Sequence, residues 1–168
     1  INRKKYLDTD MIPDVHHNML LNTEFAAHYN GLRVQAEFIQ NYVYLNDPVS
    51  FGQEDVSRLF FKGWYVHAGI LLFGGRQRYD THYGEFSQPV RGRKWGDLEL
   101  LLRYDYLDLN SHHILGGEGR NLTAGLNYYL NNNVKIVLNY TYTDNKSIQE
   151  GDPGIQYHGL SLRTEIDF

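Results

Sequence analysis

The sequence predicts an all-β protein, a transmembrane antiparallel β-barrel of which about seven strands are visible. Three observations predict this fold. Apolar and polar residues alternate with a period of two along stretches of about 11 residues. Aromatic residues gather at the two ends of these stretches, with small aliphatic residues between them. Acidic and basic residues share the polar side of the same stretches.

The composition narrows the class of protein. The 168 residues include 14 Tyr and 16 Gly but no Cys, so disulfides and thiolate metal sites are excluded. A net charge of −4 argues against a nucleic-acid-binding protein. No stretch of about 18 apolar residues occurs, which excludes a membrane-spanning helix. A barrel strand stays possible, because it needs only about 9–11 residues, half of them polar.

We expect seven strands and no helix. The strands are predicted over residues 19–29, 32–44, 60–72, 98–106, 120–130, 134–144 and 156–168. Two connections, Asn30-Gly31 and residues 131–133, are short Asn-rich turns. Residues 45–57, 107–119 and 145–155 are expected to be long loops on the other side. Residues 74–94 form a long connection on the short-turn side and are expected to hold an extra short strand or to fold into the lumen.

A soluble sheet with one face in a core would alternate in the same way. Further features therefore have to decide whether the apolar side faces lipid or a protein core. Eleven residues, at about 3.3 Å each and tilted by about 40°, span an apolar band of about 25 Å. Unlike charges along the polar side would be costly inside a dry core but not in a watery lumen. A bilayer also requires that the sheet close. We therefore expect residues 1–168 to be the C-terminal part of one β-barrel domain, with no second domain and with the missing strands upstream or in another chain.

Several motifs resemble one family. They are Gly63-Trp64-Tyr65-Val66-His67-Ala68, Gly74-Gly75 followed by Tyr79, Gly84 with Phe86, Trp95-Gly96-Asp97-Leu98-Glu99-Leu100, Arg103-Tyr104-Asp105-Tyr106-Leu107-Asp108-Leu109-Asn110, Gly116-Gly117-Glu118-Gly119, residues 121–129 and Val134-Lys135-Ile136. Together they resemble the C-terminal half of the phosphate-selective porin O/P family. The resemblance implies a 16-stranded, usually trimeric barrel with a polar lumen. It also implies that Phe168 belongs to a C-terminal signal read by the barrel-assembly machinery.

The sequence departs from this family in two ways that concern selectivity. Phe73-Gly74-Gly75 stands where the family often has Thr-Gly-Glu. The ladder of arginines and lysines that selects phosphate in the family lies largely in parts that this sequence does not match. Phosphate preference therefore rests on the resemblance alone.

The alternation assigns side chains to the lumen and to the membrane boundary. Residues 60–72 are apolar in both phases, and there we favour Tyr65 and His67 inward. The lumen-facing candidates are Arg33, Glu37, His67, Glu99, Arg103, Asp105, Lys135, Arg163 and Glu165. The aromatic girdle near the long loops is predicted to contain Tyr42, Tyr44, Trp64, Tyr104, Tyr106, Tyr140 and Tyr142. The inward set also contains Glu24 and Asp167, so its six acids outnumber its four bases. We therefore expect mainly cross-strand ion pairs, with phosphate binding by Arg33, Arg103, Arg163 or Lys135 as the alternative.

These features predict an outer-membrane porin for passive diffusion of small hydrophilic or anionic solutes, with phosphate as a candidate. Two alternatives stay open: a structural or partner barrel subunit of a larger outer-membrane complex, and the C-terminal barrel of a plugged active-uptake transporter. We expect a bacterial outer-membrane location, contacts with the lipid bilayer, lipopolysaccharide and the barrel-assembly machinery, and a homotrimer or larger complex. We expect no enzyme activity, no cofactor and no metal. The pairs His16-His17 and His112-His113 are poor ligand sets, because adjacent strand residues point to opposite faces.

Overall fold

The computed structural model describes residues 5–52, 54–146 and 154–166, and these residues form strands and no helix. The strands are β1 (Val15–Tyr29), β2 (Leu32–Phe51), β3 (Glu54–Leu71), β4 (Arg76–Asp80), β5 (Glu85–Val90), β6 (Asp97–Ser111), β7 (Ile114–Tyr129), β8 (Val134–Lys146) and β9 (Ile155–Ile166). None of the described residues belongs to a helix that could cross a membrane. The all-β prediction is confirmed.

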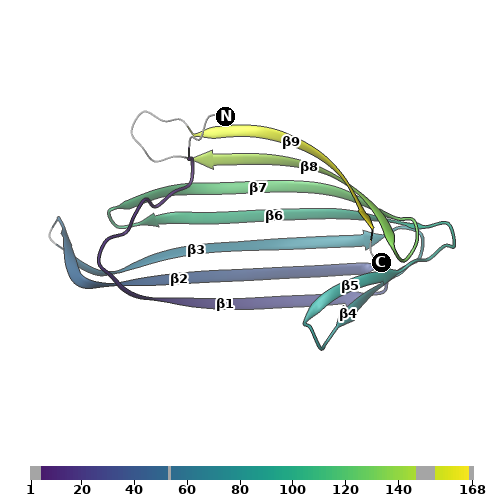
Figure 1. The fold of residues 1–168 in the computed structure, drawn as a ribbon, viewed down its shortest axis with the longest axis horizontal. Coiled ribbons are helices and arrows are strands. Elements are labelled where there is room, and N and C mark those ends of the chain that lie inside the picture. Colours follow the sequence, from purple (N-terminus) through teal and green to yellow (C-terminus); the bar gives the residue numbers. More distant parts are fainter. Residues whose placement is uncertain (1–4, 53, 147–153, 167–168) are drawn as a thin grey trace.

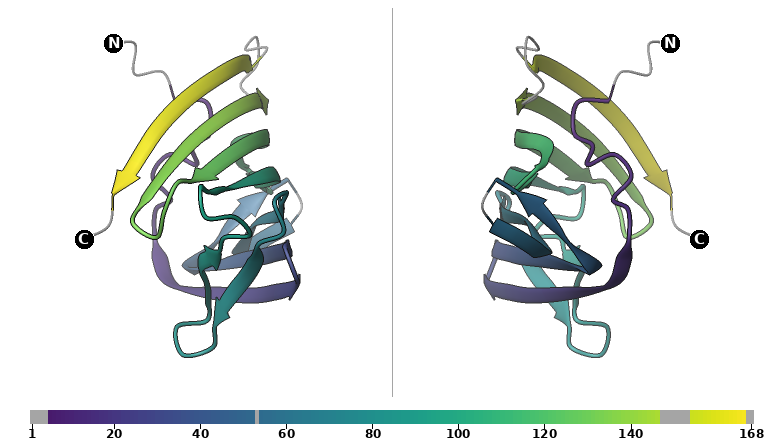
Figure 2. Two further views of the ribbon diagram at one scale, coloured as in Figure 1. Left: turned by 90° about the vertical axis from the view of Figure 1, so that its right-hand side faces the viewer. Right: turned by 90° about the vertical axis from the view of Figure 1, so that its left-hand side faces the viewer.

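Seven long strands make one antiparallel sheet in the order β1-β2-β3-β6-β7-β8-β9 (Figure 1). Its strands run for 12 to 20 residues, enough at about 3.3 Å per residue to cross the apolar band of a bilayer with tilt. β1 and β9 are its two edges, and they do not pair with each other. The sheet is curved, and residues 5–14 run along its concave side (Figure 2).

Cross-strand pairing fixes which side chains share a face. Arg33 pairs with Gly69, and Gly69 pairs with Leu101, so Leu101 lies on the same face as Arg33. Glu99 and Arg103 lie two residues before and after Leu101 on β6, and they therefore share this face. We call this the polar face. Leu32, Ile70, Leu100 and Leu126 form the neighbouring row, on the opposite side, which we call the apolar face.

The two faces differ in how they are covered. Large apolar side chains of the apolar face stay exposed, for example Phe25, Val66, Leu102, Leu122 and Leu162. They do not pack against a second layer, as the core of a soluble sandwich would. A row of exposed apolar side chains on alternating positions of long strands is the pattern of a lipid-facing barrel wall.

The predicted long loops at 45–57 and 107–119 are wrong. β2 and β3 continue to a turn at Gly52, and β6 and β7 continue to the His112-His113 turn. Pairing shifts register between Tyr44 and Val49 and between Asp108 and Asn110, so bulges absorb the irregular residues and the ladders continue. Positive φ values at Gly52 (67°) and His112 (47°) close the two turns. Most of the third predicted loop, 145–155, lies outside the described residues.

The connection 74–94 contains two short strands, which pair as a hairpin separate from the main sheet. We call residues 72–96 the hairpin segment. The hairpin lies over the polar face at the short-turn end, where the Phe86 ring is 6.0 Å from His28 and 5.5 Å from the Arg33 guanidinium. Its tip extends past β1 at the lower right of Figure 1. The sequence therefore anticipated a short strand here but not a paired hairpin.

At the end opposite the hairpin, the polar face carries apolar side chains instead of charged ones. The buried cluster near the Gly52 and His112-His113 turns consists of Val43, Leu45, Val56, Leu59 and Phe61, and Ile12 packs against it. The backbone amide of Asp8 donates to the Gly116 carbonyl, which ties residues 5–14 to β7. Outside the strands, the Lys5 ammonium hydrogen-bonds the Asp8 carboxylate and lowers the pKa of that group. The concave side is thus covered at both ends, by residues 5–14 and by the hairpin.

Candidate functional site

Most charges of the polar face are paired with each other. Arg103 contacts Asp105 at 2.6 Å, and its guanidinium lies 3.9 Å from the Tyr65 ring. Glu165 accepts contacts from both Lys135 (2.9 Å) and Arg163 (3.2 Å). These groups are partly exposed, so each pair is worth at most about 1 kcal/mol. Opposite charges this close also cancel at a distance, which leaves little net field from this part of the face.

Acidic residues of β1 and β2 meet without a base between them. Glu24 and Glu37 are directly opposite each other in the pairing of β1 with β2. The amide nitrogen of Asn22 donates to both carboxylates, at 2.9 Å to Glu24 and 2.8 Å to Glu37. His67 is on the same face, opposite Arg103 on β6 and Gln35 on β2. The lumen-facing candidates of the sequence therefore share one face, and they lie in several small groups rather than one ring.

Glu99 is the most enclosed of the candidates, with no exposed surface. Its oxygen Oε1 lies 2.9 Å from Arg33 Nε and accepts a hydrogen bond from Gln77 Nε2 at 2.8 Å. The other oxygen, Oε2, accepts from Arg33 Nη2 (3.3 Å), Asn127 Nδ2 (3.1 Å) and the Tyr129 hydroxyl (2.8 Å). A buried carboxylate is tolerated only with such a full set of donors. Glu99 is therefore covered rather than open to a lumen.

Asp97 is equally buried and holds the base of the hairpin segment. Its Oδ1 accepts hydrogen bonds from the backbone amides of Phe73 (3.0 Å) and Leu98 (2.9 Å), and its Oδ2 accepts from that of Gly92 (2.7 Å). One carboxylate thus joins the chain entering the hairpin to the chain leaving it. Gly92 has to be glycine, because a Cβ there would overlap the Phe73 carbonyl oxygen.

The hairpin segment carries a concentration of basic residues. Arg76, Arg78, Arg91, Arg93 and Lys94 stand against only two acids, Asp80 and Glu85, between residues 76 and 94. Within the part of the chain that the structure describes, none of these five side chains forms an ion pair. A cavity of about 470 Å³ is lined by four of them, all but Arg76, together with Asn132 and no acidic residue.

Two of these bases are held in place by neutral groups. Arg91 Nη1 donates to the Leu130 carbonyl at 2.8 Å and Nη2 to Asn132 Oδ1 at 3.3 Å, so Arg91 links the hairpin segment to the turn between β7 and β8. The Arg93 guanidinium lies 4.8 Å from the Phe73 ring and 5.3 Å from the Trp95 ring. Both side chains keep their full charge while their positions are fixed.

Sequence reasoning missed this basic cluster. The signal was present in Arg76-Gln77-Arg78 and Arg91-Gly92-Arg93-Lys94, two basic runs inside one long connection. Attention to strands alone gave a polar face in which acids outnumber bases. A second cavity of about 280 Å³ lies between the hairpin and the sheet, lined by Arg33 and Lys135 of the sheet and Phe86 and Gln88 of the hairpin among others. The hairpin strand β5 thus lies beside the charged residues Arg33, Lys135 and Glu165 of the sheet.

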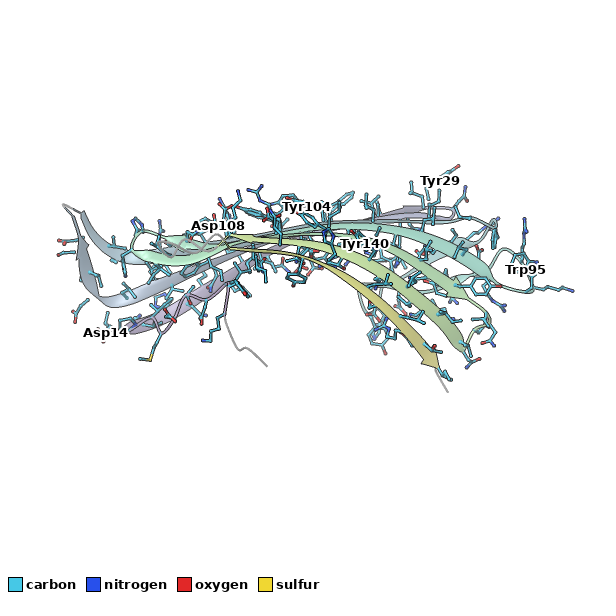
Figure 3. The ribbon with its side chains drawn as sticks, turned by 90° about the horizontal axis from the view of Figure 1, so that it is seen from above. Asp14, Tyr29, Trp95, Tyr104, Asp108 and Tyr140 are labelled. Atoms are coloured by element: carbon cyan, nitrogen blue, oxygen red, sulfur yellow. The ribbon has the colours of Figure 1, made fainter. Side chains whose placement is uncertain are left out.

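The predicted girdle residues lie together on the apolar face. Trp64 packs against Tyr104 with ring centroids 5.3 Å apart, and Tyr140 donates or accepts a hydrogen bond at 2.7 Å with His158. Tyr42, Tyr44, Tyr106 and Tyr142 belong to the same face by register. Figure 3 places Tyr104 and Tyr140 along the middle of the sheet, with Trp95 and Tyr29 towards the short-turn end. Phe168 lies outside the described residues.

The prediction that His16 and His17 point apart is wrong. A bulge between Val15 and His17 breaks the alternation, and the two Nδ1 atoms lie 2.6 Å apart. Among the described residues, no group of three or more histidine or acidic side chains is arranged to hold a metal.

The phosphate-selective porin O and P family matches the chain over residues 1–168. The chain belongs to this family. It is also 32% identical over 120 residues to an uncharacterized protein from Caulobacter vibrioides, a match that covers 67% of this chain and 24% of that protein. The chain therefore spans about a quarter of that relative. Its alternating faces and its seven antiparallel strands agree with membership of a porin family.

Proposed function

We propose that the chain forms part of the wall of a diffusion channel in a bacterial outer membrane, which passes small hydrophilic solutes. The observation that carries the proposal is the separation of the two faces of one sheet. The apolar face leaves its aliphatic side chains exposed, while the polar face holds the hairpin and the ion pairs of Arg33, Arg103 and Lys135. The pairs Lys62–Asp108 and Arg120–Glu118 lie on the other face, towards the end of the sheet with the His112-His113 turn. A lipid-facing outer side and a wet inner side are what a porin wall requires.

The proposed channel prefers anions. Most charges of the sheet cancel in pairs, Glu24 and Glu37 excepted, whereas the five bases of the hairpin segment have no acidic partner among the described residues. Unpaired like charges beside an aqueous path raise the local concentration of counter-ions and favour their passage. Phosphate is the candidate solute suggested by the family, and chloride would pass by the same electrostatics.

The apolar face also indicates what the wall would contact in the membrane. The apolar face would contact lipid, and the girdle of Tyr and Trp side chains would lie at the outer boundary, close to lipopolysaccharide. We also propose a homotrimer and assembly through the barrel-assembly machinery, with Phe168 in its signal. These partners rest on membership of the family.

The test is single-channel recording on the full-length protein in a planar bilayer. We expect discrete open-channel steps and, under a salt gradient, a reversal potential with the sign of an anion-preferring pore. Folded protein without conductance would overturn the proposal and favour a structural subunit. Conductance that appears only after deletion of an N-terminal plug would favour active uptake. A cation-preferring pore would overturn the anion preference alone.

A further inference from the structure

The hairpin meets the sheet through one side chain that is almost completely buried. Gln77, the second residue of β4, is 5% exposed, while its neighbours Arg76 and Arg78 are exposed. Its amide nitrogen donates to Glu99 Oε1 at 2.8 Å and to the Gly31 carbonyl at 3.2 Å. Its backbone amide donates to the Asn30 carbonyl at 2.7 Å. Gln77 thus joins β4 to β6 and to the turn between β1 and β2.

The acceptor of this contact is rigidly held without the hairpin. Three side chains of the sheet, Arg33, Asn127 and Tyr129, approach the Glu99 carboxylate from β2 and β7. Gln77 is the ligand of Glu99 that comes from the hairpin. Loss of the Gln77 amide removes one of the five contacts to the Glu99 carboxylate and leaves its ion pair with Arg33 in place.

The base of the hairpin is held independently of Gln77. Asp97 accepts the amides of Phe73 and Gly92, and Arg91 donates to the Leu130 carbonyl. The hairpin tip at residues 81–84 is exposed. A hairpin that is fixed at its base and free at its tip takes its orientation from contacts along its length, and Gln77 makes the most buried of these.

We propose that Gln77 and Glu99 form a latch that holds the β4–β5 hairpin over the polar face, and that Gln77 is a positioning residue for the ion preference of the channel. It acts through the arginines that flank it, Arg76 and Arg78, and through the rest of the basic cluster. The inference rests on the proposed function, because ion preference presupposes a channel. The position of the hairpin itself can be measured without conductance.

The first measurement compares Gln77→Leu in the full-length protein with wild type, in a planar bilayer. Gln40→Leu is the matched control, since Gln40 lies on the apolar face opposite Lys62. We expect Gln77→Leu to lose most of the anion preference and to show frequent current fluctuations, while Gln40→Leu behaves as wild type. An unchanged reversal potential and unchanged noise in Gln77→Leu would overturn the latch while leaving the porin function intact.

The second measurement reports on the hairpin alone. Residues 1–168 contain no cysteine, so Ser87→Cys introduces one thiol into this part of the protein, on β5, where it lines the cavity beneath the hairpin. Any cysteine in the rest of the full-length protein is first replaced by serine. We expect a charged thiol reagent to modify this cysteine faster in the Gln77→Leu background than with Gln77 present. Equal rates would overturn the latch even if the protein did not conduct. Gln77→Asn keeps the amide on a shorter side chain, and it replaces Gln77→Leu in both measurements if the leucine variant does not fold.

Discussion

The ion pairs of the sheet and the basic cluster of the hairpin lie close together but use charge in different ways. On the sheet, Arg33, Arg103 and Lys135 each have a carboxylate within 3 Å. On the hairpin, Arg78 and Arg93 have none among the described residues. Paired charges stabilise structure and contribute little field, whereas unpaired charges contribute field and little stability. Stability and the proposed ion preference would therefore depend on separate segments.

The largest expected effect is on stability and concerns the buried pair. Arg33→Met leaves Glu99 buried without its counter-charge, so we expect a loss of about 3–5 kcal/mol in the free energy of unfolding. Denaturant unfolding of the folded protein in detergent measures it. Arg163→Met is the control: its side chain is 67% exposed, and a surface pair contributes at most about 1 kcal/mol. Similar losses for both variants would contradict the distinction between buried and exposed pairs.

A smaller loss in the free energy of unfolding is expected at Gly92, where the base of the hairpin is tightly packed. Gly92→Ala places a Cβ against the Phe73 carbonyl, and the backbone has to move, which costs about 1–3 kcal/mol. Gly159→Ala is the matched change, because a Cβ at Gly159 meets nothing within 4 Å. In the middle of β9 we expect it to be neutral or stabilising by about 0.5 kcal/mol. The same unfolding experiment compares them. Equal stability of the two variants would show that the base tolerates movement.

The next prediction concerns selectivity rather than stability. Arg78→Gln combined with Arg93→Gln removes two unpaired positive charges, and we expect the reversal potential to move towards that of a cation-preferring pore. Arg103→Gln combined with Asp105→Asn also removes two charges, but of opposite sign, and should leave the reversal potential near the wild-type value. If the second pair of substitutions shifts it as far as the first, the contrast between sheet and hairpin fails.

The smallest expected effect is that of salt. Raising ionic strength from about 0.1 M to about 1 M shortens the screening length from about 10 Å to about 3 Å. The anion preference generated by exposed hairpin bases should fall over this range when the reversal potential is measured at a fixed concentration ratio. The stabilisation by the pair of Arg33 and Glu99 should change little, because Glu99 is fully buried and Arg33 is 16% exposed, and a largely buried pair is screened less than an exposed one. A preference that persists at high salt would indicate a site of close binding instead.

Most of the fold could be predicted from the sequence, because alternation is a local property. In residues 98–106 and 134–144, period two alone indicated which side chains share a face, and the register of β6 and β8 agrees. Residues 60–72 were ambiguous for a physical reason. Leu59 and Phe61 belong to the polar face but are buried in the apolar cluster beneath residues 5–14, so both sides of β3 are apolar there.

The site could be predicted only in part. Glu99 looked like one more charge along a wet wall, since nothing in the neighbouring residues indicates that Gln77 covers it from 22 positions away. Asp97 gave no signal either, because it binds backbone amides, which every residue provides. Contacts of the hairpin with the sheet depend on three-dimensional placement, and alternation carries no information about it.

Gln77 has a consequence for the order in which the protein is assembled. Its partners come from the turn between β1 and β2 and from β6, so the hairpin can dock only after these strands have come into register. Before that point the hairpin segment, with its exposed arginines, would be open to proteases that cut after basic residues. During biogenesis, the time at which trypsin no longer cleaves after Arg78 would then show when this part of the wall is complete.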